Sequence, residues 1–149
     1  MSNKKKLSEK EIWETLRGVD TSSVEQPMPN NEKLKYVSWA DAWVLIMKYY
    51  PQTTYENTPP VFYRSGENEG TCEVGCKVTI GEFSREMTLP VMTNHMPMKS
   101  IPNPTSRDIS DAKQRCLVKT LAMFGLGLHL WEKKKNSSAK VEMFESQEF

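Results

Sequence analysis

Residues 72–91 read CEVGCKVTIGEFSREMTLPV, which is two runs of alternating apolar and polar residues around a Gly-Glu pair. Such alternation is typical of half-buried β-strands, because successive side chains of a strand point to opposite faces. Gly81-Glu82 suits a two-residue type II′ turn, since glycine readily adopts the positive φ of the first turn position. The sequence therefore predicts a β-hairpin here.

The predicted turn also fixes the register of this hairpin. It creates apolar pairs on one face and a pair of opposite charges on the other: Ile80 with Phe83, Cys76 with Met87, Val74 with Leu89, and Lys77 with Glu86. A slip of one residue would break every pair. Arg85 is an exception, because it lies opposite Val78 on the apolar face. It either extends its charged end to solvent, which we favour, or points at a ligand.

Prolines and polar residues divide the chain on either side of the hairpin. A strand within residues 53–64, interrupted by Pro59-Pro60, is expected to join the hairpin through the polar loop 65–70 and complete a three-stranded antiparallel meander. Residues 90–104 carry four prolines and predict an ordered or semi-ordered loop. Residues 18–33 lack periodicity and predict a linker.

The first two predicted helices each begin with a capping box. Ser8 with Glu11 begins a short helix whose apolar face carries Ile12, Trp13 and Leu16. Ser38 with Asp41 begins a longer helix that ends before Pro51 and carries Trp39 and Trp43 in its apolar stripe. Two tryptophans at this spacing could form a platform for nucleobases, but such residues are more often core, and we assign them to the core.

A third capping box, Thr105 with Asp108, predicts a helix that runs to about Phe124, where Gly125 provides a stop. One broad apolar arc of this helix contains Ile109, Ala112, Cys116, Leu117, Thr120, Leu121, Met123 and Phe124, with Lys113 inside it near the exposed end. The other side carries a stripe of Asp111, Arg115 and Lys119. The predicted fold class is α+β, a small antiparallel β-meander packed against helices, with an N-terminal helix and a flexible C-terminal tail.

Composition limits the classes of protein that this chain can represent. A length of 149 residues with 38% hydrophobic residues predicts one domain, part of which is not core. An odd number of cysteines, Cys72, Cys76 and Cys116, fits reduced thiols rather than a disulfide framework. No run approaches the roughly 18 consecutive apolar residues of a membrane span, and the N-terminus has no apolar run behind its lysines, so we expect a cytoplasmic protein.

The motifs of common enzymes are missing from the sequence. No G-x-x-x-x-G-K-[ST] loop is present to hold nucleotide phosphates. Cys72 and Cys76 would lie about 13 Å apart on a strand that rises about 3.3 Å per residue, too far to share one zinc ion, and only His95 and His129 could add ligands. Asp108 and Asp111 are explained by a helix N-terminus. We therefore expect no cofactor, no metal and no enzymatic activity.

Charge is distributed unevenly near the C-terminus. Residues 101–135 contain seven basic and three acidic residues, whereas residues 136–149 contain one basic and three acidic residues. A basic segment followed by an acidic tail suggests a polyanionic partner and a segment that competes with it, although charge alone favours an ordinary solvated surface.

Several stretches of the chain resemble a known family. They are Tyr36-Val37-Ser38-Trp39-Ala40-Asp41-Ala42-Trp43, Leu89-Pro90-Val91-Met92, Asp108-Ile109-Ser110-Asp111, Arg115-Cys116-Leu117-Val118-Lys119 and Phe124-Gly125-Leu126-Gly127-Leu128. In combination, over residues 36–131, they are similar to the phage single-strand annealing proteins of the Sak and Erf kind. The helix that ends in Phe124-Gly125 more distantly resembles the DNA-contacting helix of the eukaryotic Rad-type annealing protein. Lys119 is the only residue of this helix that directly matches a basic residue at that site of the relative.

Two stretches depart from the family pattern. Glu132-Lys133-Lys134-Lys135 replaces an acidic Gly-Glu-Asp type segment, and Val118 and Ala122 stand where the distant relative has basic residues.

The resemblance implies single-stranded DNA binding and ATP-independent annealing of complementary strands in phage homologous recombination, by a homo-oligomeric ring or filament. Phosphates are expected to contact Arg107, Lys113, Arg115 and Lys119, with Arg85 and Lys99 as weaker candidates, and Asp111 to neutralise Arg115 in part through an i, i+4 pair. The expected organisation is an N-terminal helix and linker (1–35), an annealing core (36–131) and a basic-then-acidic tail (132–149). The alternatives are a small protein-interaction or regulatory module without DNA activity and, third, a nuclease.

The acidic end of the chain has three possible roles. It is expected to compete with DNA for the basic helix, or to dock a host or phage single-strand binding protein through Phe149. Alternatively, Val141 and Phe144 pack on the core as part of a C-terminal helix.

Overall fold

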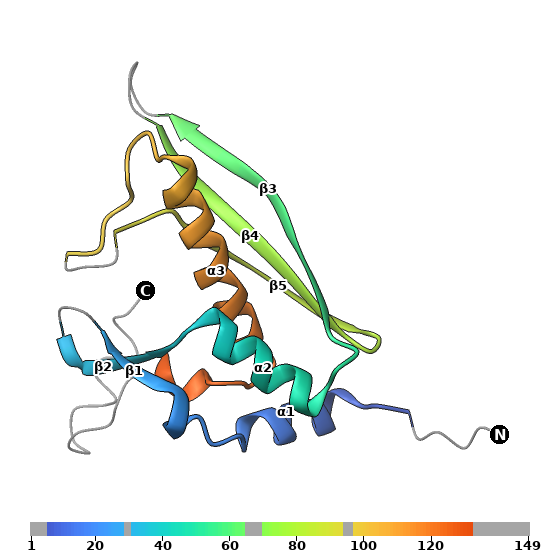
Figure 1. The fold of residues 1–149 in the computed structure, drawn as a ribbon. Coiled ribbons are helices and arrows are strands. Elements are labelled where there is room, and N and C mark those ends of the chain that lie inside the picture. Colours follow the sequence, from blue (N-terminus) through green and yellow to red (C-terminus); the bar gives the residue numbers. More distant parts are fainter. Residues whose placement is uncertain (1–5, 29–30, 65–69, 94–96, 133–149) are drawn as a thin grey trace, which may run out of the picture.

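The computed structural model describes residues 6–28, 31–64, 70–93 and 97–132, which form an α+β fold with an antiparallel sheet packed on helices (Figure 1). The elements follow in the order α1 (Glu9–Arg17), η1 (Ser22–Val24), β1 (Glu25–Met28), β2 (Asn31–Val37), α2 (Trp39–Tyr49), β3 (Thr54–Arg64), β4 (Gly70–Ile80), β5 (Phe83–Pro90), α3 (Ser106–Ala122) and η2 (Leu128–Leu130). The predicted α+β class, with an N-terminal helix and a small antiparallel meander packed against helices, is confirmed for the described residues.

The hairpin of β4 and β5 has the predicted register. Its pairs include Cys76 with Met87, Lys77 with Glu86, and Val78 with Arg85. Gly81 has φ of +62°, and Glu82 is not among the non-glycine residues with positive φ, which is the combination that a type II′ turn requires. The sheet order β3-β4-β5 confirms the three-stranded meander.

β3 continues through its two prolines by means of a β-bulge. Thr58 pairs with Gly75 and Val61 pairs with Glu73, so Pro59 and Pro60 are accommodated where the register shifts. Proline cannot donate a backbone hydrogen bond to a neighbouring strand, so it is tolerated in edge strands and at bulges. β3 is an edge strand, and its two prolines lie at the bulge. The sequence therefore identified the strand and its interruption correctly.

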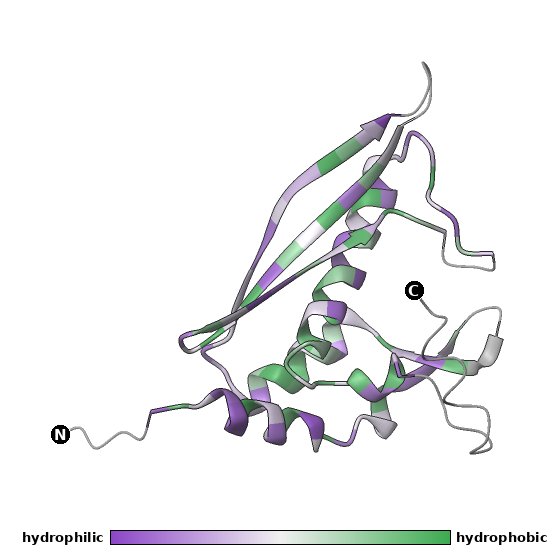
Figure 2. Ribbon diagram, turned by 180° about the vertical axis from the view of Figure 1, so that it is seen from behind, coloured by the Kyte–Doolittle hydropathy of each residue, from purple (hydrophilic) through white to green (hydrophobic). Residues whose placement is uncertain are grey.

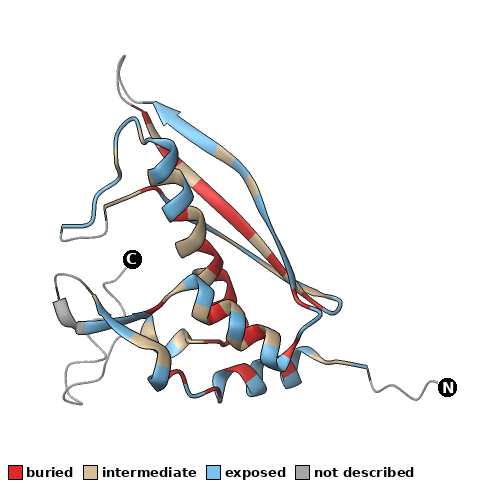
Figure 3. Ribbon diagram, in the orientation of Figure 1, coloured by how far each residue is buried: buried red, intermediate tan, exposed pale blue. Residues whose placement is uncertain are grey.

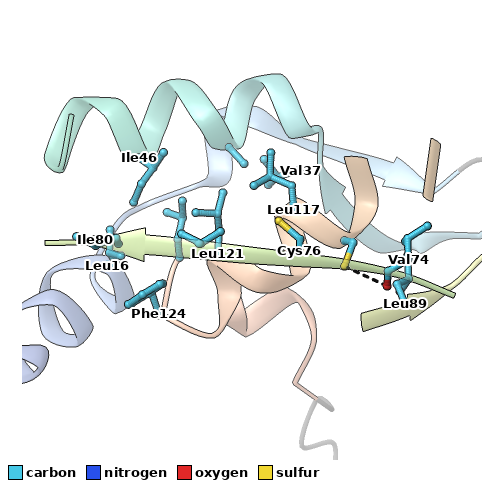
Figure 4. Packing of buried hydrophobic residues seen from close by; sticks show 14 of the residues in the cluster. Leu16, Val37, Ile46, Val74, Cys76, Ile80, Leu89, Leu117, Leu121 and Phe124 are labelled. Atoms are coloured by element: carbon cyan, nitrogen blue, oxygen red, sulfur yellow. Dashed lines mark hydrogen bonds between the residues drawn. The ribbon is translucent and has the colours of Figure 1, made fainter. Parts of the chain in front are cut away.

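The core lies where α3 crosses β4 and β5. Figure 3 shows that burial is concentrated along β4 and the C-terminal half of α3, whereas β3 and the first turn of α3 are exposed. Figure 2 shows hydrophobic and hydrophilic residues mixed along these strands, as expected for a sheet with one covered face. The buried side chains come from α1, β2, α2, β4, β5 and α3 (Figure 4), and they include Leu16, Val37, Ile46, Val74, Ile80, Leu89, Leu117 and Leu121.

The first helix belongs to this core. Ser8 forms the predicted capping box with Glu11, and Ile12 and Leu16 are fully buried. The φ of Gly125 is +116°, and a Cβ there would lie 3.1 Å from the backbone nitrogen of Arg17, so α1 packs directly on the turn after α3. The prediction that Trp13 shares the apolar face is wrong, because its side chain is 43% exposed.

The predicted linker over residues 18–33 is wrong in its second half. β1 and β2 form an antiparallel hairpin, in which Glu25 pairs with Val37 and Pro27 with Lys35 (Figure 1). Its strands are largely exposed and show little apolar alternation, which is the signal that sequence analysis requires.

Helix α2 begins at Ser38 and ends before Pro51, as predicted, but its two tryptophans lie in different surroundings. Trp43 packs against the core, with its ring edge-on to Tyr55 at a centroid distance of 5.2 Å. Trp39 is 43% exposed, so its assignment to the core is wrong.

Helix α3 has the predicted Thr105–Asp108 capping box, and most of its predicted apolar arc is buried. Met123 is an exception, because it is exposed at the C-cap. The preceding proline-rich segment is ordered where it is described, with a β-bridge between Met92 and Ser100. None of the described helices is long and apolar enough to cross a membrane. The predicted tail and the loop 65–69 lie outside the described residues.

Candidate nucleic-acid interface

Three of the predicted DNA-contacting residues follow the edge strand β5. Arg85 lies on β5 itself, Lys119 Nζ donates a 2.9 Å hydrogen bond to the carbonyl oxygen of Thr88, and Arg115 donates a 3.3 Å hydrogen bond to that of Met92. Positions 85 and 92 are separated by seven residue steps, or about 23 Å of extended chain at about 3.3 Å per residue. We call Arg85, Lys119 and Arg115 the β5 row.

The carbonyl that Lys119 contacts lies on the open side of the sheet. Val91 donates its N–H to Cys72 on β4 at 2.8 Å. Because backbone groups alternate in direction along an antiparallel strand, residues 87, 89 and 91 face β4, and Thr88 faces away from it. An edge strand presents unpaired carbonyls and N–H groups, and a lysine is one of the means by which proteins protect such an edge.

The side chain of Arg115 is partly buried and bonded to a backbone carbonyl, unlike that of an ordinary surface arginine. Burial lowers the pKa of its guanidinium, and the negative charge of Asp111 opposes this shift. A guanidinium still carries its charge at any physiological pH. The predicted i, i+4 ion pair with Asp111 is not among the contacts of the described residues, where Arg115 bonds the Met92 carbonyl instead.

Arg85 is partly exposed, and its charged end lies against other residues of the protein. Its guanidinium lies 4.9 Å from the centre of the Phe124 ring and 3.2 Å from a carboxylate oxygen of Glu9. The charged end therefore covers an aromatic ring, and Glu9 on α1 neutralises part of its charge.

The other three predicted residues lie apart from the β5 row. Arg107 is exposed in the first turn of α3, and Lys99 is exposed in the proline-rich segment. Lys113 is half-buried close enough to Cys72 for its charge to favour the thiolate, against the burial that raises the pKa of this cysteine. Within the part of the chain that the structure describes, none of these three has an ion-pair partner.

A groove that the sequence analysis missed lies beside Arg115. It has a volume of about 520 Å³ and lies between β2, the start of α2, α3 and the segment 126–131. Its lining is mostly apolar, with three half-exposed aromatic side chains, Tyr36, Trp39 and Trp131. We call it the aromatic groove. The related signal in the sequence was the possible nucleobase platform of Trp39 and Trp43, which was set aside in favour of the core.

A small polar cluster connects β1 to the segment after α3. Thr21 Oγ1 donates to Glu25 Oε2 at 2.6 Å, and His129 Nε2 lies 3.1 Å from the same oxygen. The hydrogen bond from Thr21 and then that from His129 lower the pKa of Glu25. This cluster holds the β1-β2 hairpin against η2, and both of these elements contribute to the aromatic groove.

The cysteines are buried and reduced. Burial raises the pKa of the Cys76 thiol to about 11, with a further contribution from Cys116, and it also raises the pKa of Cys116. Within the described ranges, no three His, Cys, Asp or Glu side chains are grouped as a metal site would require.

Comparison with known proteins identifies the family. No curated protein matches the chain. The family model described as Sak Single Strand Annealing Protein matches residues 10–139, which include every described helix and strand except the first residue of α1, and also include both the β5 row and the aromatic groove. The match is wider than the resemblance over 36–131 and covers most of the chain. The chain therefore belongs to the Sak single-strand annealing protein family.

Proposed function

We propose that this protein binds single-stranded DNA and anneals complementary strands, without ATP hydrolysis, during phage homologous recombination in the host cytoplasm. The family match over residues 10–139 carries this proposal. The cationic β5 row gives it a physical basis, because phosphate contacts from Lys and Arg supply the sequence-independent part of nucleic-acid affinity.

Annealing needs no chemical step from the protein. Pairing is downhill by about 1.4 kcal/mol per base-pair step, so the protein has only to hold strands with their bases accessible. We propose that Lys119 and Arg115 hold phosphates, and that Arg107, Lys113 and Lys99 extend the positive surface. Arg85 contributes less, because Glu9 already neutralises part of its charge.

An annealing assay with purified protein tests the proposal. Two complementary oligonucleotides, one carrying a fluorophore and the other a quencher, are mixed in chelator and without nucleotide. We expect annealing faster than the spontaneous rate, and no acceleration with heat-denatured protein. A requirement for ATP, or no acceleration at any protein concentration, would refute the proposed function. Loss of labelled strand on adding Mg²⁺ would indicate a nuclease instead.

We further propose that the protein assembles into a homo-oligomer through β3. Val61, Phe62 and Tyr63 are each about half exposed, and the outer edge of β3 is unpaired in the described sheet. An exposed apolar edge strand is a ready template for another chain. Changing Phe62 and Val61 to Lys should lower the mass measured in solution, whereas an unchanged mass would exclude this interface.

The acidic residues 136–149 are proposed to compete with DNA or to dock a single-strand binding protein. Truncation after Asn136 distinguishes these roles at low salt, where electrostatic competition is strongest. Tighter DNA binding supports competition, whereas unchanged binding leaves the partner role. Loss of thermal stability would show that these residues belong to the fold.

A further inference from the structure

We propose that the aromatic groove binds the unpaired bases of single-stranded nucleic acid by stacking, while the adjoining cations hold the phosphates. This inference rests on the proposed function and assigns it a second element, a base site distinct from the β5 row. It assigns Trp39 to a nucleobase platform, a role that helical spacing alone did not favour over the core.

The first argument is the exposure of large aromatic rings in a concave site. Tyr36 on β2, Trp39 on α2 and Trp131 just after η2 are 40%, 43% and 50% exposed, respectively, and all line one groove. Single exposed rings are common on protein surfaces, but exposed rings gathered around one concave apolar site are typical of a binding site. Behind them lie partly or fully buried aliphatic residues, Val118, Leu121, Leu126 and Leu130, which give the groove an apolar floor.

The second argument is the charge around the groove. Among the residues that the structure describes, the two charged ones that line it are both cations, Lys35 on β2 and Arg115 on α3. Glu25 lies close enough to Lys35 for their charges to interact, but its carboxylate is already bonded to Thr21 and His129. An apolar peptide partner would not require cations at this rim, whereas a polyanion with flat apolar bases matches both features.

The third argument is continuity. Arg115 belongs to the β5 row and also lines the groove, so a strand whose phosphates follow β5 reaches the groove at this residue. Proteins that bind single strands without sequence preference combine such a cationic path with aromatic stacking platforms.

This arrangement would select unpaired strands. Bases in a duplex are stacked on one another, so their faces are not available to Trp39 or Trp131. Stacking uses the face of a base and not its pairing edge, so a complementary strand can compete for each base and draw it from the groove. The groove therefore favours the substrate of annealing and releases its product.

The test compares tryptophan variants of the full chain in binding to a fluorescent oligo-dT. Trp39→Leu and Trp131→Leu remove rings from the groove but keep apolar volume, and Trp39→Phe keeps a stacking ring. Trp13→Leu is the matched control, because Trp13 is also 43% exposed but lies on α1 outside the groove. Circular dichroism establishes that each variant is folded, and an abasic oligonucleotide of equal length provides the ligand control.

We expect Trp39→Leu and Trp131→Leu each to weaken oligo-dT binding about five- to 100-fold, with Trp39→Phe and Trp13→Leu close to wild type. The salt dependence should keep its slope, because no phosphate contact is lost. The abasic strand should bind wild type and Trp39→Leu equally, and the preference of wild type for single over double strands should decrease in the variant.

Other outcomes overturn the inference. Wild-type affinity in both folded leucine variants would place the bases elsewhere, and a lower mass in solution together with unaltered DNA affinity per subunit would assign the groove to a second copy of the chain. If Trp39→Leu does not fold, Trp131→Leu and the abasic comparison on wild type decide. If wild type binds oligo-dT no more tightly than the abasic strand, the stacking proposal is refuted but the proposed function is not. If it binds neither strand, the proposed function itself is refuted.

Discussion

Lys119 Nζ lies 2.9 Å from the carbonyl oxygen of Thr88 and donates a hydrogen bond to it across the space between α3 and the open edge of β5. One side chain thus fastens the helix to the sheet and places a positive charge at an exposed strand edge. An ammonium group has three donors, so a phosphate can be held by the two that Thr88 does not use.

Lys119→Ala should weaken single-strand binding and reduce the slope of log affinity against log salt by about 0.7, the contribution of one phosphate contact. The fold should survive, because the lost hydrogen bond is exposed. Binding titrations at several salt concentrations measure the slope. Lys48→Ala is the matched control, since it removes an equal charge from the exposed face of α2. Equal slopes in wild type and Lys119→Ala would remove Lys119 from the interface.

Leu16→Ala should destabilise the protein by about 2–5 kcal/mol, because the side chain is fully buried and its loss leaves a cavity. Trp13→Ala, three residues earlier on the exposed side of the same helix, should cost about 1 kcal/mol or less, the value of its contact with Arg17. Denaturant unfolding gives both free energies. Similar costs for the two variants would contradict the packing of α1 into the core.

Gly75→Ala should cost about 1–3 kcal/mol through overpacking, because its new methyl group would overlap the hydroxyl of Thr58 on β3. Removing that hydroxyl and methyl in Thr58→Ala makes room for it. The double variant should therefore be more stable than the sum of the two single changes predicts. Strict additivity in the double-mutant cycle would show that the two residues do not meet.

Glu25→Gln should lower stability at pH 7 by about 1 kcal/mol or less, the usual value of a hydrogen-bonded pair near the surface. The folded pKa of Glu25 is below its ordinary value of 4.5, so the ionised carboxylate stabilises the fold above that pH. This contribution is lost as the pH falls through the folded pKa. The stabilities of the two proteins in thermal unfolding should therefore differ at pH 7, and the difference should shrink as the pH falls below 4.5 and through the folded pKa; a constant difference would contradict this cause.

The elements that sequence reasoning identified are those with a local physical signal. The β4-β5 register followed from strict alternation and from Gly81, and the starts of α1, α2 and α3 followed from their caps. The β1-β2 hairpin had no such signal, because β1 is only four residues long and contains Pro27, and Leu34, Lys35 and Tyr36 of β2 are all exposed. Trp39 was wrongly assigned to the core. Helical spacing predicts the face of the helix on which a side chain lies, but it does not predict whether a neighbouring element covers that side chain.

The candidate site was predictable only in part for a similar reason. The cations could be named from the sequence, but the bonds of Arg115 to Met92 and of Lys119 to Thr88 join residues that are 23 and 31 positions apart. The aromatic groove is lined by five separate stretches of the chain. Neither arrangement leaves a periodic pattern in the chain.

The two edge strands of the β3-β4-β5 sheet differ. On β5, Lys119 of the same chain donates a hydrogen bond to the carbonyl of Thr88, whereas β3 carries exposed apolar side chains. Two β3 edges that met each other would close a two-fold dimer, so a ring or filament built through β3 needs this edge to meet a different surface on the next copy, which is a head-to-tail contact. Such an array has a direction, and each copy presents its β5 row in the same sense. A strand of DNA laid along it would be held with one 5′-to-3′ orientation throughout, so the asymmetry of a single sheet would set the polarity of the whole nucleoprotein.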